Sequence, residues 1–248
     1  MRLIDRWVGI PLCFFASFWP LKKAQADSNS SLATNIPPPD TIVFILIAEI
    51  GALVVAYPAI KETRKQHPKS RICFITAPAG LQTLELMGFE KEDIFLLETS
   101  SIKSLLKGIV NIRSHFKGKR VSAIVLEPFT RFSTLLSAWI GASKRIGCYR
   151  FLNEGVFLGN ILTHRLVYNP HLHISQTYFA LAKALIEPDS AKPLLKEYIP
   201  SQIKNRLKIN IPEKEQQTLM KRLQSECPEN PLKKIILLNA NASDIVPL

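Results

Sequence analysis

Thr41 to Ala48 read TIVFILIA, a run that is rich in β-branched side chains and apolar beyond its first residue. A strand buried on both faces of a parallel sheet has this continuous pattern, whereas a strand with one wet face alternates. Glu49-Ile50-Gly51 follows as a turn, and the stretch from Ala52 to Gln66 looks helical. We therefore predict a strand, a turn and a helix, the opening unit of an α/β domain.

The same rhythm continues along the chain. Strands alternating with helices predict a parallel sheet with right-handed crossovers, so the expected fold class is α/β with a Rossmann-like sheet. The further strands are expected at Arg71–Thr76, Ile94–Leu97, Val121–Leu126 and Arg145–Cys148, and the helices between them at Leu81–Met87, Ile102–Phe116 and Phe132–Ile140.

A membrane span is the alternative for the first of these units. Thr41 to Ile60 contains only one charged residue, Glu49, and has the length that a spanning helix needs. Together with a span at Trp7–Leu21 it would make an integral membrane protein. We favour the strand and helix because the strand-helix rhythm continues after them.

The uncharged run Trp7–Leu21 allows four interpretations: a spanning helix, a secretory signal, an interfacial anchor and a buried amphipathic helix. Pro11 and Pro20 weaken a continuous spanning helix. The anchor is favoured because tryptophans bracket the run and basic residues flank it. We expect a membrane-associating segment at 1–26, a linker at 27–40, a Rossmann-like domain with connecting helices at 41–230, and the first strand and loop of a second domain at 231–248.

The chain is basic, with 32 Lys and Arg against 20 Asp and Glu in 248 residues, a formal net charge of +12. Such a surface attracts phosphates, anionic lipids or nucleic acid. The cations are scattered and no nucleic-acid-binding motif is present, so we expect no nucleic-acid partner. The 4 cysteines lie far apart, and His171 and His173 are not spaced for a helix face, so we predict no metal site.

Ligands of parallel sheets bind at the carboxyl ends of the strands, so the loops beginning at Glu49, Ala77, Glu127 and Tyr149 are the candidate binding loops. No glycine-rich dinucleotide or P-loop motif occurs in them. Later in the chain, helices are expected at Gln176–Leu185 and Glu213–Ser225, and a buried strand at Lys233–Asn239.

Four stretches, in this order along the chain, resemble glycosyltransferase family 9, the ADP-heptose:lipopolysaccharide heptosyltransferase-like enzymes. The resemblance runs from about Thr41 to the end of the chain. The stretches are Ile47-Ala48-Glu49-Ile50-Gly51-Ala52 with Tyr57-Pro58-Ala59-Ile60; Arg145-Ile146-Gly147-Cys148-Tyr149-Arg150; Glu154-Gly155 with Leu162-Thr163-His164; and Leu237-Leu238-Asn239-Ala240-Asn241-Ala242-Ser243-Asp244.

The resemblance implies a GT-B fold, in which two Rossmann-like domains face each other across a cleft. The first domain takes the acceptor, a lipopolysaccharide core, and the second takes a nucleotide-activated sugar such as ADP-heptose. This chain then corresponds to the acceptor domain and only the start of the donor domain. The resemblance also implies a place on the cytoplasmic face of the inner membrane, and we expect no cofactor.

The resemblance also implies site residues. In the family the catalytic base is an Asp after the glycine of the first strand-helix loop, where this chain has Ala52, and the nearest carboxylate is Glu49. A bland alternative is that Glu49 only caps a helix start. The expected acceptor-binding residues are Gly51, Ala52, Arg131, Glu154, Thr163 and His164, and the expected donor-binding residues are Asn239, Asn241, Ser243 and Asp244.

Two functional hypotheses stay open. The first is a heptosyltransferase-like enzyme that needs a carboxy-terminal domain, so that the chain alone is inactive. The second is a non-catalytic, membrane-associated acceptor-binding remnant or partner subunit, which Ala52 favours.

Overall fold

The computed structural model describes residues 8–18, 38–48, 50–151, 156–187, 207 and 211–226. The chain divides into two compact units, residues 1–207 and 208–248. Glu49, Glu154, Asn239, Asn241, Ser243 and Asp244 lie outside the described residues, as does the strand expected at 233–239.

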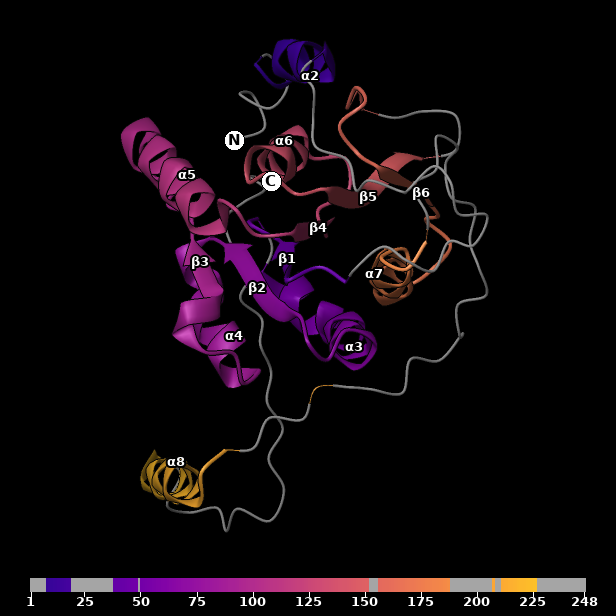
Figure 1. Ribbon diagram of the computed structural model, residues 1–248. Coiled ribbons are helices and arrows are strands. Elements are labelled where there is room, and N and C mark those ends of the chain that lie inside the picture. The colour runs from indigo at the N-terminus through magenta and orange to yellow at the C-terminus, as the bar shows by residue number, and fades with distance from the viewer. Residues whose placement is uncertain are drawn as a thin grey trace, which may run out of the picture. The chain divides into compact units, whose positions relative to one another are not determined.

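The first unit is built on a parallel sheet of six strands in the order β3-β2-β1-β4-β5-β6 (Figure 1). The Rossmann-like α/β fold expected from the sequence is therefore confirmed. The strands are β1 (Thr41–Ile45), β2 (Arg71–Thr76), β3 (Ile94–Leu96), β4 (Val121–Val125), β5 (Lys144–Phe151) and β6 (His164–Tyr168).

Helices cover both faces of the sheet. The apolar side chains of α3, α4 and α7 pack on one face, and those of α5 and α6 pack on the other. Every residue of β1 is buried, as a central strand covered on both faces must be. The helices are α3 (Ile50–Gln66), α4 (Leu81–Leu86), α5 (Ile102–Phe116), α6 (Arg131–Trp139) and α7 (Ile174–Lys183), with 3-10 turns at Pro78–Gly80 and Lys91–Asp93.

The first strand and helix settle the alternative of a second membrane span. Residues 41–45 pair with both β2 and β4, and α3 begins at Ile50. A spanning helix over Thr41–Ile60 is therefore wrong. No helix within the described ranges is both long enough and apolar enough to cross a bilayer.

Strand β6 was not expected from the sequence. It reads HRLVY, so two polar side chains open it, and it lies at the edge of the sheet beside β5. Between these two strands the register shifts at Tyr149, because Cys148 pairs with Leu166 and Arg150 pairs with Val167. Tyr149 is thus an extra residue, a β-bulge.

The amino-terminal helix α2 (Gly9–Phe18) packs against the body of the first unit. Cys13 is fully buried, whereas Phe15 and Phe18 are 69% and 74% exposed. One side of α2 is thus buried, as expected for a buried amino-terminal helix. The other side is apolar and exposed. The second unit contains α8 (Glu213–Glu226), the helix expected at 213–225, and none of its residues is buried.

Candidate functional site

The strand order reverses between β1 and β4, which places the switch point of the sheet at their carboxyl ends. Ile45 pairs with Val125, so the two loops that follow these strands are neighbours. The crevice at such a switch point is where open parallel sheets bind ligands. The loop that begins at Glu127 and residues 46–48 after β1 therefore meet at one edge.

Glu127 joins these two loops. It is 8% exposed, and its Oε1 accepts hydrogen bonds from the backbone N–H groups of Ile47 at 2.8 Å and Ala48 at 2.6 Å. Its Oε2 accepts a hydrogen bond from the hydroxyl of Ser133 in α6. The carboxylate thus satisfies two backbone donors that have left the β1 ladder. From the sequence, only the loop that begins at Glu127 was predicted as a binding loop, and no role was predicted for the Glu127 side chain. A charged residue directly after a buried strand is the signal that marks it.

Gly51 and Ala52 lie in the first turn of α3 and face different ways. Gly51 is exposed, and a Cβ atom built on it would meet nothing within 4 Å. Ala52 is 9% exposed and belongs to the core cluster under α3. The open space is therefore above Gly51, while the methyl group of Ala52 offers no proton acceptor.

Phe129, in the loop between β4 and α6, has an unusual backbone. Its φ of 60° is the only positive φ among the described non-glycine residues. Its ring packs edge-on against Tyr168 at the carboxyl end of β6, with 5.6 Å between the ring centroids. A bulky residue in this region is strained and persists only where packing holds it. The contact between Phe129 and Tyr168 thus joins the loop after β4 to the end of β6, on the far side of β5 in the sheet.

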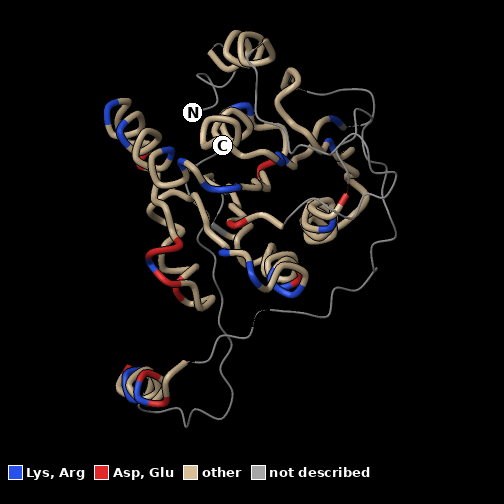
Figure 2. The backbone as a smooth tube through the Cα atoms, in the orientation of Figure 1, with Lys and Arg blue, Asp and Glu red and all other residues tan. Residues whose placement is uncertain are grey.

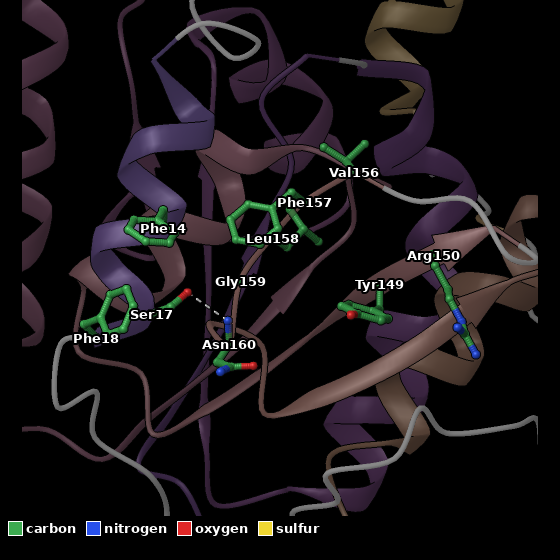
Figure 3. Close-up of a pocket in the computed structure, with 10 residues that line it drawn as sticks. All are labelled: Phe14, Ser17, Phe18, Tyr149, Arg150, Val156, Phe157, Leu158, Gly159 and Asn160. Atoms are coloured by element: carbon green, nitrogen blue, oxygen red, sulfur yellow. Dashed lines mark hydrogen bonds between the residues drawn. The ribbon is translucent and has the colours of Figure 1, made fainter.

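A pocket of about 510 Å³ lies between α2, the end of β5 and the segment 156–160 (Figure 3). In that view Phe14 and Phe18 of α2 form one side, and Tyr149 and Arg150 form the other. Among the residues that the structure describes, the lining contains no Asp or Glu and consists of Phe14, Ser17, Phe18, Tyr149, Arg150, Val156, Phe157, Leu158, Gly159 and Asn160.

Two consecutive residues of β5 line this pocket because of the bulge. Side chains alternate between the faces of a regular strand, so neighbours such as Tyr149 and Arg150 would point to opposite sides. The extra residue breaks that alternation, and both side chains border the same space. Re-aiming side chains beside a site is a common use of bulges.

The polar side of the pocket is fixed by Arg165 of β6. Its guanidinium carbon lies 4.9 Å from the centroid of the Tyr149 ring, and its Nη2 donates to Oδ1 of Asn160 at 3.0 Å. The side of α2 is fixed by Ser17, whose hydroxyl accepts from the Asn160 N–H at 3.1 Å. A phenol, an amide and guanidinium groups beside aromatic rings suit a polar or anionic ligand with an apolar face.

Arg131, expected to bind acceptor, opens α6 beside the pocket. Its Nε donates to the carbonyl oxygen of Phe157 at 3.1 Å. Its aliphatic stem lies so close to Gly9 of α2 that a Cβ there would come within 2.9 Å of the Arg131 Cδ. Arg131 therefore helps to hold α2 and the segment 156–160 in place.

Thr163 and His164 do not lie at the carboxyl edge. His164 pairs with Ile146, which pairs with Ile124 inside β4. It is fully buried, with Nδ1 2.8 Å from the Thr163 hydroxyl and Nε2 3.0 Å from the carbonyl oxygen of Glu187. Thr163 also accepts from the backbone N–H of Arg145 at 2.8 Å. The structure thus uses both side chains to join β5, β6 and the end of α7, and an acceptor contact by His164 stays a prediction.

No group of three His, Cys, Asp or Glu side chains that would hold a metal ion occurs in the part of the chain that the structure describes. His173 instead caps α7, accepting at Nδ1 from the Ser175 N–H. Burial raises the pKa of Cys73 and of Cys148 to about 12. These thiols are therefore protonated and serve as packing groups rather than nucleophiles.

No protein-family model matches the sequence, and no curated protein matches it significantly. Solved structures do match. The crystal structure of the glycosyl transferase family 9 from Veillonella parvula DSM 2008 superposes with a TM-score of 0.51 at 16% identity, over 77% of this chain and 51% of that one. The E. coli heptosyltransferase WaaC with ADP-2-deoxy-2-fluoro heptose gives 0.48 at 10% identity, over 61% and 50%. The same enzyme with ADP gives 0.46 at 10% identity, over 61% and 49%.

The chain therefore spans about half the length of each solved structure that it matches. The likeness to the Veillonella protein concerns the fold, because the identity is low. This chain has the fold of one half of a glycosyltransferase family 9 structure.

Proposed function

We propose that this chain is the acceptor-binding half of a heptosyltransferase-like glycosyltransferase, which moves a sugar from a nucleotide-activated donor of the ADP-heptose kind to a lipopolysaccharide core. The observation that carries the proposal is the correspondence of this single Rossmann-like unit to half of a family 9 structure. The four sequence stretches that resemble the same family support it independently.

The acceptor binds along the carboxyl edge of the sheet, from the open surface above Gly51 to the pocket beside Tyr149. Aromatic rings such as Tyr149 pack against the apolar faces of sugar rings. The core sugars of the acceptor carry phosphate groups, which Arg150 and Arg131 attract. The pocket supports this because the part of its lining that the structure describes contains aromatic and cationic side chains and no carboxylate.

The transfer is a displacement at the anomeric carbon of the donor. The acceptor hydroxyl oxygen attacks this carbon, the bond to the nucleoside diphosphate breaks, and the hydroxyl proton passes to a base. We assign the base to Glu49 because it is the carboxylate of the first strand-helix loop. The turn that contains Asn239, Asn241, Ser243 and Asp244 receives the departing diphosphate through backbone N–H groups.

The second candidate is a binding protein without transfer activity. One observation favours it: the position at which the family has its base is Ala52, whose methyl group packs in the core. In either case the chain alone is inactive, because a GT-B site is assembled from two domains. Both candidates work at the cytoplasmic face of the inner membrane, where the lipid-linked acceptor is found.

Acceptor binding is the first test. Calorimetric titration of the full chain with a phosphorylated core oligosaccharide should show saturable binding, and Arg150→Ala should weaken it about tenfold, or ~1.4 kcal/mol. Arg222→Ala, an exposed substitution on α8, is the matched control and should leave affinity unchanged. Absence of binding, or equal loss in both variants, would contradict the proposed site.

Transfer is the second test. The chain is incubated with a nucleotide-activated sugar whose sugar carries the label, together with the core acceptor. The expected amount of labelled acceptor is no larger than in a heat-killed sample. Turnover that Glu49→Gln abolishes and Glu90→Gln preserves would overturn the inactivity and establish the enzyme. Acceptor binding without any transfer favours the binding protein.

A further inference from the structure

Helix α5 carries an apolar row that no described part of its unit covers. Ile102, Leu106 and Val110 are 70%, 57% and 57% exposed. Their spacing of four residues places them along one side of the helix. The side of α5 that meets the sheet is a different one, where Ile112 and Phe116 are buried. The apolar arc of α5 is therefore wider than the part that the sheet needs.

The charge around this row has one sign. From Ile102 to Arg120 the sequence contains no Asp or Glu. Figure 2 shows basic positions along α5. Lys103 and Lys107 are exposed beside the row and form no ion pair with any carboxylate that the structure describes. The cations of this stretch are Lys103, Lys107, Arg113, Lys117, Lys119 and Arg120, of which Arg120 forms an ion pair with Asp40 at 2.6 Å.

An aromatic side chain continues the surface onto α6. Trp139, the last residue of α6, is 48% exposed. The guanidinium carbon of Arg113 lies 5.1 Å from the centroid of its ring, and Arg113 also donates to its carbonyl oxygen. An indole ring held beside a cation is the pair of groups that settles at the headgroup level of a bilayer.

We propose that α5 is a membrane-contact helix that lies in the interface of an anionic phospholipid bilayer. The row Ile102, Leu106 and Val110 enters the acyl boundary, and Lys103 and Lys107 extend to the phosphate groups. Charge decides between a membrane and a protein partner. An anionic lipid surface matches a helix whose charged side chains are all basic, whereas a protein would need a matched set of carboxylates.

This contact is distinct from the amino-terminal segment and holds whether or not the chain transfers sugar. α2 is an apolar helix and can bind lipid by itself, so a bulk binding assay does not isolate α5. A probe on α5 does isolate it. In a Cys227→Ser background the described cysteines are buried, so a cysteine introduced at a surface position can be labelled selectively.

The experiment places the environment-sensitive dye NBD on Leu106→Cys of the full chain. Vesicles of phosphatidylglycerol and phosphatidylcholine should shift its emission to the blue and raise it at least twofold, while vesicles of phosphatidylcholine alone should not. The matched control is the dye on Leu86→Cys, because Leu86 is 60% exposed on α4, which packs on the other face of the sheet. An unchanged signal at position 106, or equal changes at 106 and 86, would overturn the proposal.

A second measurement covers the case of a protein partner. With the dye on Ile102→Cys instead, Leu106→Glu with Val110→Glu should reduce the signal change in the anionic vesicles at least fivefold, and Leu86→Glu should leave it unchanged. Sedimentation of the parent chain without vesicles should show no self-association through this row. If the parent is a dimer that the double variant dissolves, α5 is a contact between copies and the membrane proposal fails.

Discussion

Oε1 of Glu127 lies 2.6 Å from the backbone nitrogen of Ala48, a residue 79 positions earlier in the chain. The same oxygen accepts from Ile47, so one buried carboxylate fixes the path of the loop that leads to Glu49 and α3. The edge of the sheet at which ligands are expected is therefore held by Glu127 as well as by the strand ladder.

Glu127→Ala should lower the free energy of unfolding by about 2–4 kcal/mol, because two buried backbone donors and the Ser133 hydroxyl lose their acceptor. Glu127→Gln keeps one acceptor oxygen and should lower it by roughly half as much. Urea unfolding followed by circular dichroism measures both values. The exposed substitution Glu90→Ala is the control, with an expected effect within about 0.5 kcal/mol. A Glu127→Ala chain as stable as the control would refute this role.

Gly159→Ala should release α2. Gly159 has a φ of +58°, and a Cβ there would lie 1.9 Å from the Ser17 hydroxyl oxygen and 2.8 Å from the Cys13 carbonyl oxygen. Hydrogen exchange of residues 8–18 should therefore become at least tenfold faster. Gly118→Ala is the matched control, because Gly118 also has a positive φ but opens onto free space. It should cost about 1–2 kcal/mol of global stability and leave exchange in α2 unchanged relative to the rest of the chain.

His67 should make the stability of the first unit sensitive to mild acid. Burial, and then the positive charge of Lys144, lower its pKa below the ordinary value of 6.5. A histidine with a depressed folded-state pKa contributes stability that is fully present above its unfolded-state pKa, near 6.5, and is lost as the pH falls through the folded-state value. Stability measured by urea unfolding should thus decline below pH 6.5, and His67→Gln should reduce that decline. Identical slopes in the two chains would contradict the assignment.

The buried thiols should resist modification in the folded chain. The pKa of about 12 for Cys73 and for Cys148 leaves almost no thiolate at pH 8, and Cys13 is fully buried. In a Cys227→Ser chain, Ellman's reagent should react only at the rate of unfolding and then release three equivalents in denaturant. Rapid labelling of the native chain would show that these cysteines are accessible.

The sequence predicted the centre of the sheet well and its edge poorly. β1, β2 and β4 are buried on both faces, so their continuous apolar runs were visible in the sequence. β6 lies at the edge and includes His164 and Arg165, whose polarity hides the strand pattern, so no strand was predicted there. The burial of His164 depends on partners such as the Glu187 carbonyl oxygen, which the local sequence pattern does not reveal.

The candidate site, too, could be predicted from the sequence only in part. The loops at Glu127 and Tyr149 could be predicted because parallel sheets bind ligands at the carboxyl ends of their strands. The bond from Glu127 to Ala48 could not, since it depends on the pairing of strands that are far apart in the sequence. The contribution of α2 to the pocket was missed for the same reason, because Ser17 reaches Asn160 only through tertiary packing.

The bulge at Tyr149 also determines what kinds of mutation this wall of the pocket can accept. Substitutions at Tyr149 or Arg150 change the chemistry of the wall and leave its geometry alone. Loss of a single codon there would restore strict alternation along β5 and turn one of the two side chains to the opposite face. Among homologues, residues 149 and 150 are therefore expected to vary in type, while the number of residues in β5 is kept. A one-residue deletion would remove one of the two side chains from the polar side of the pocket.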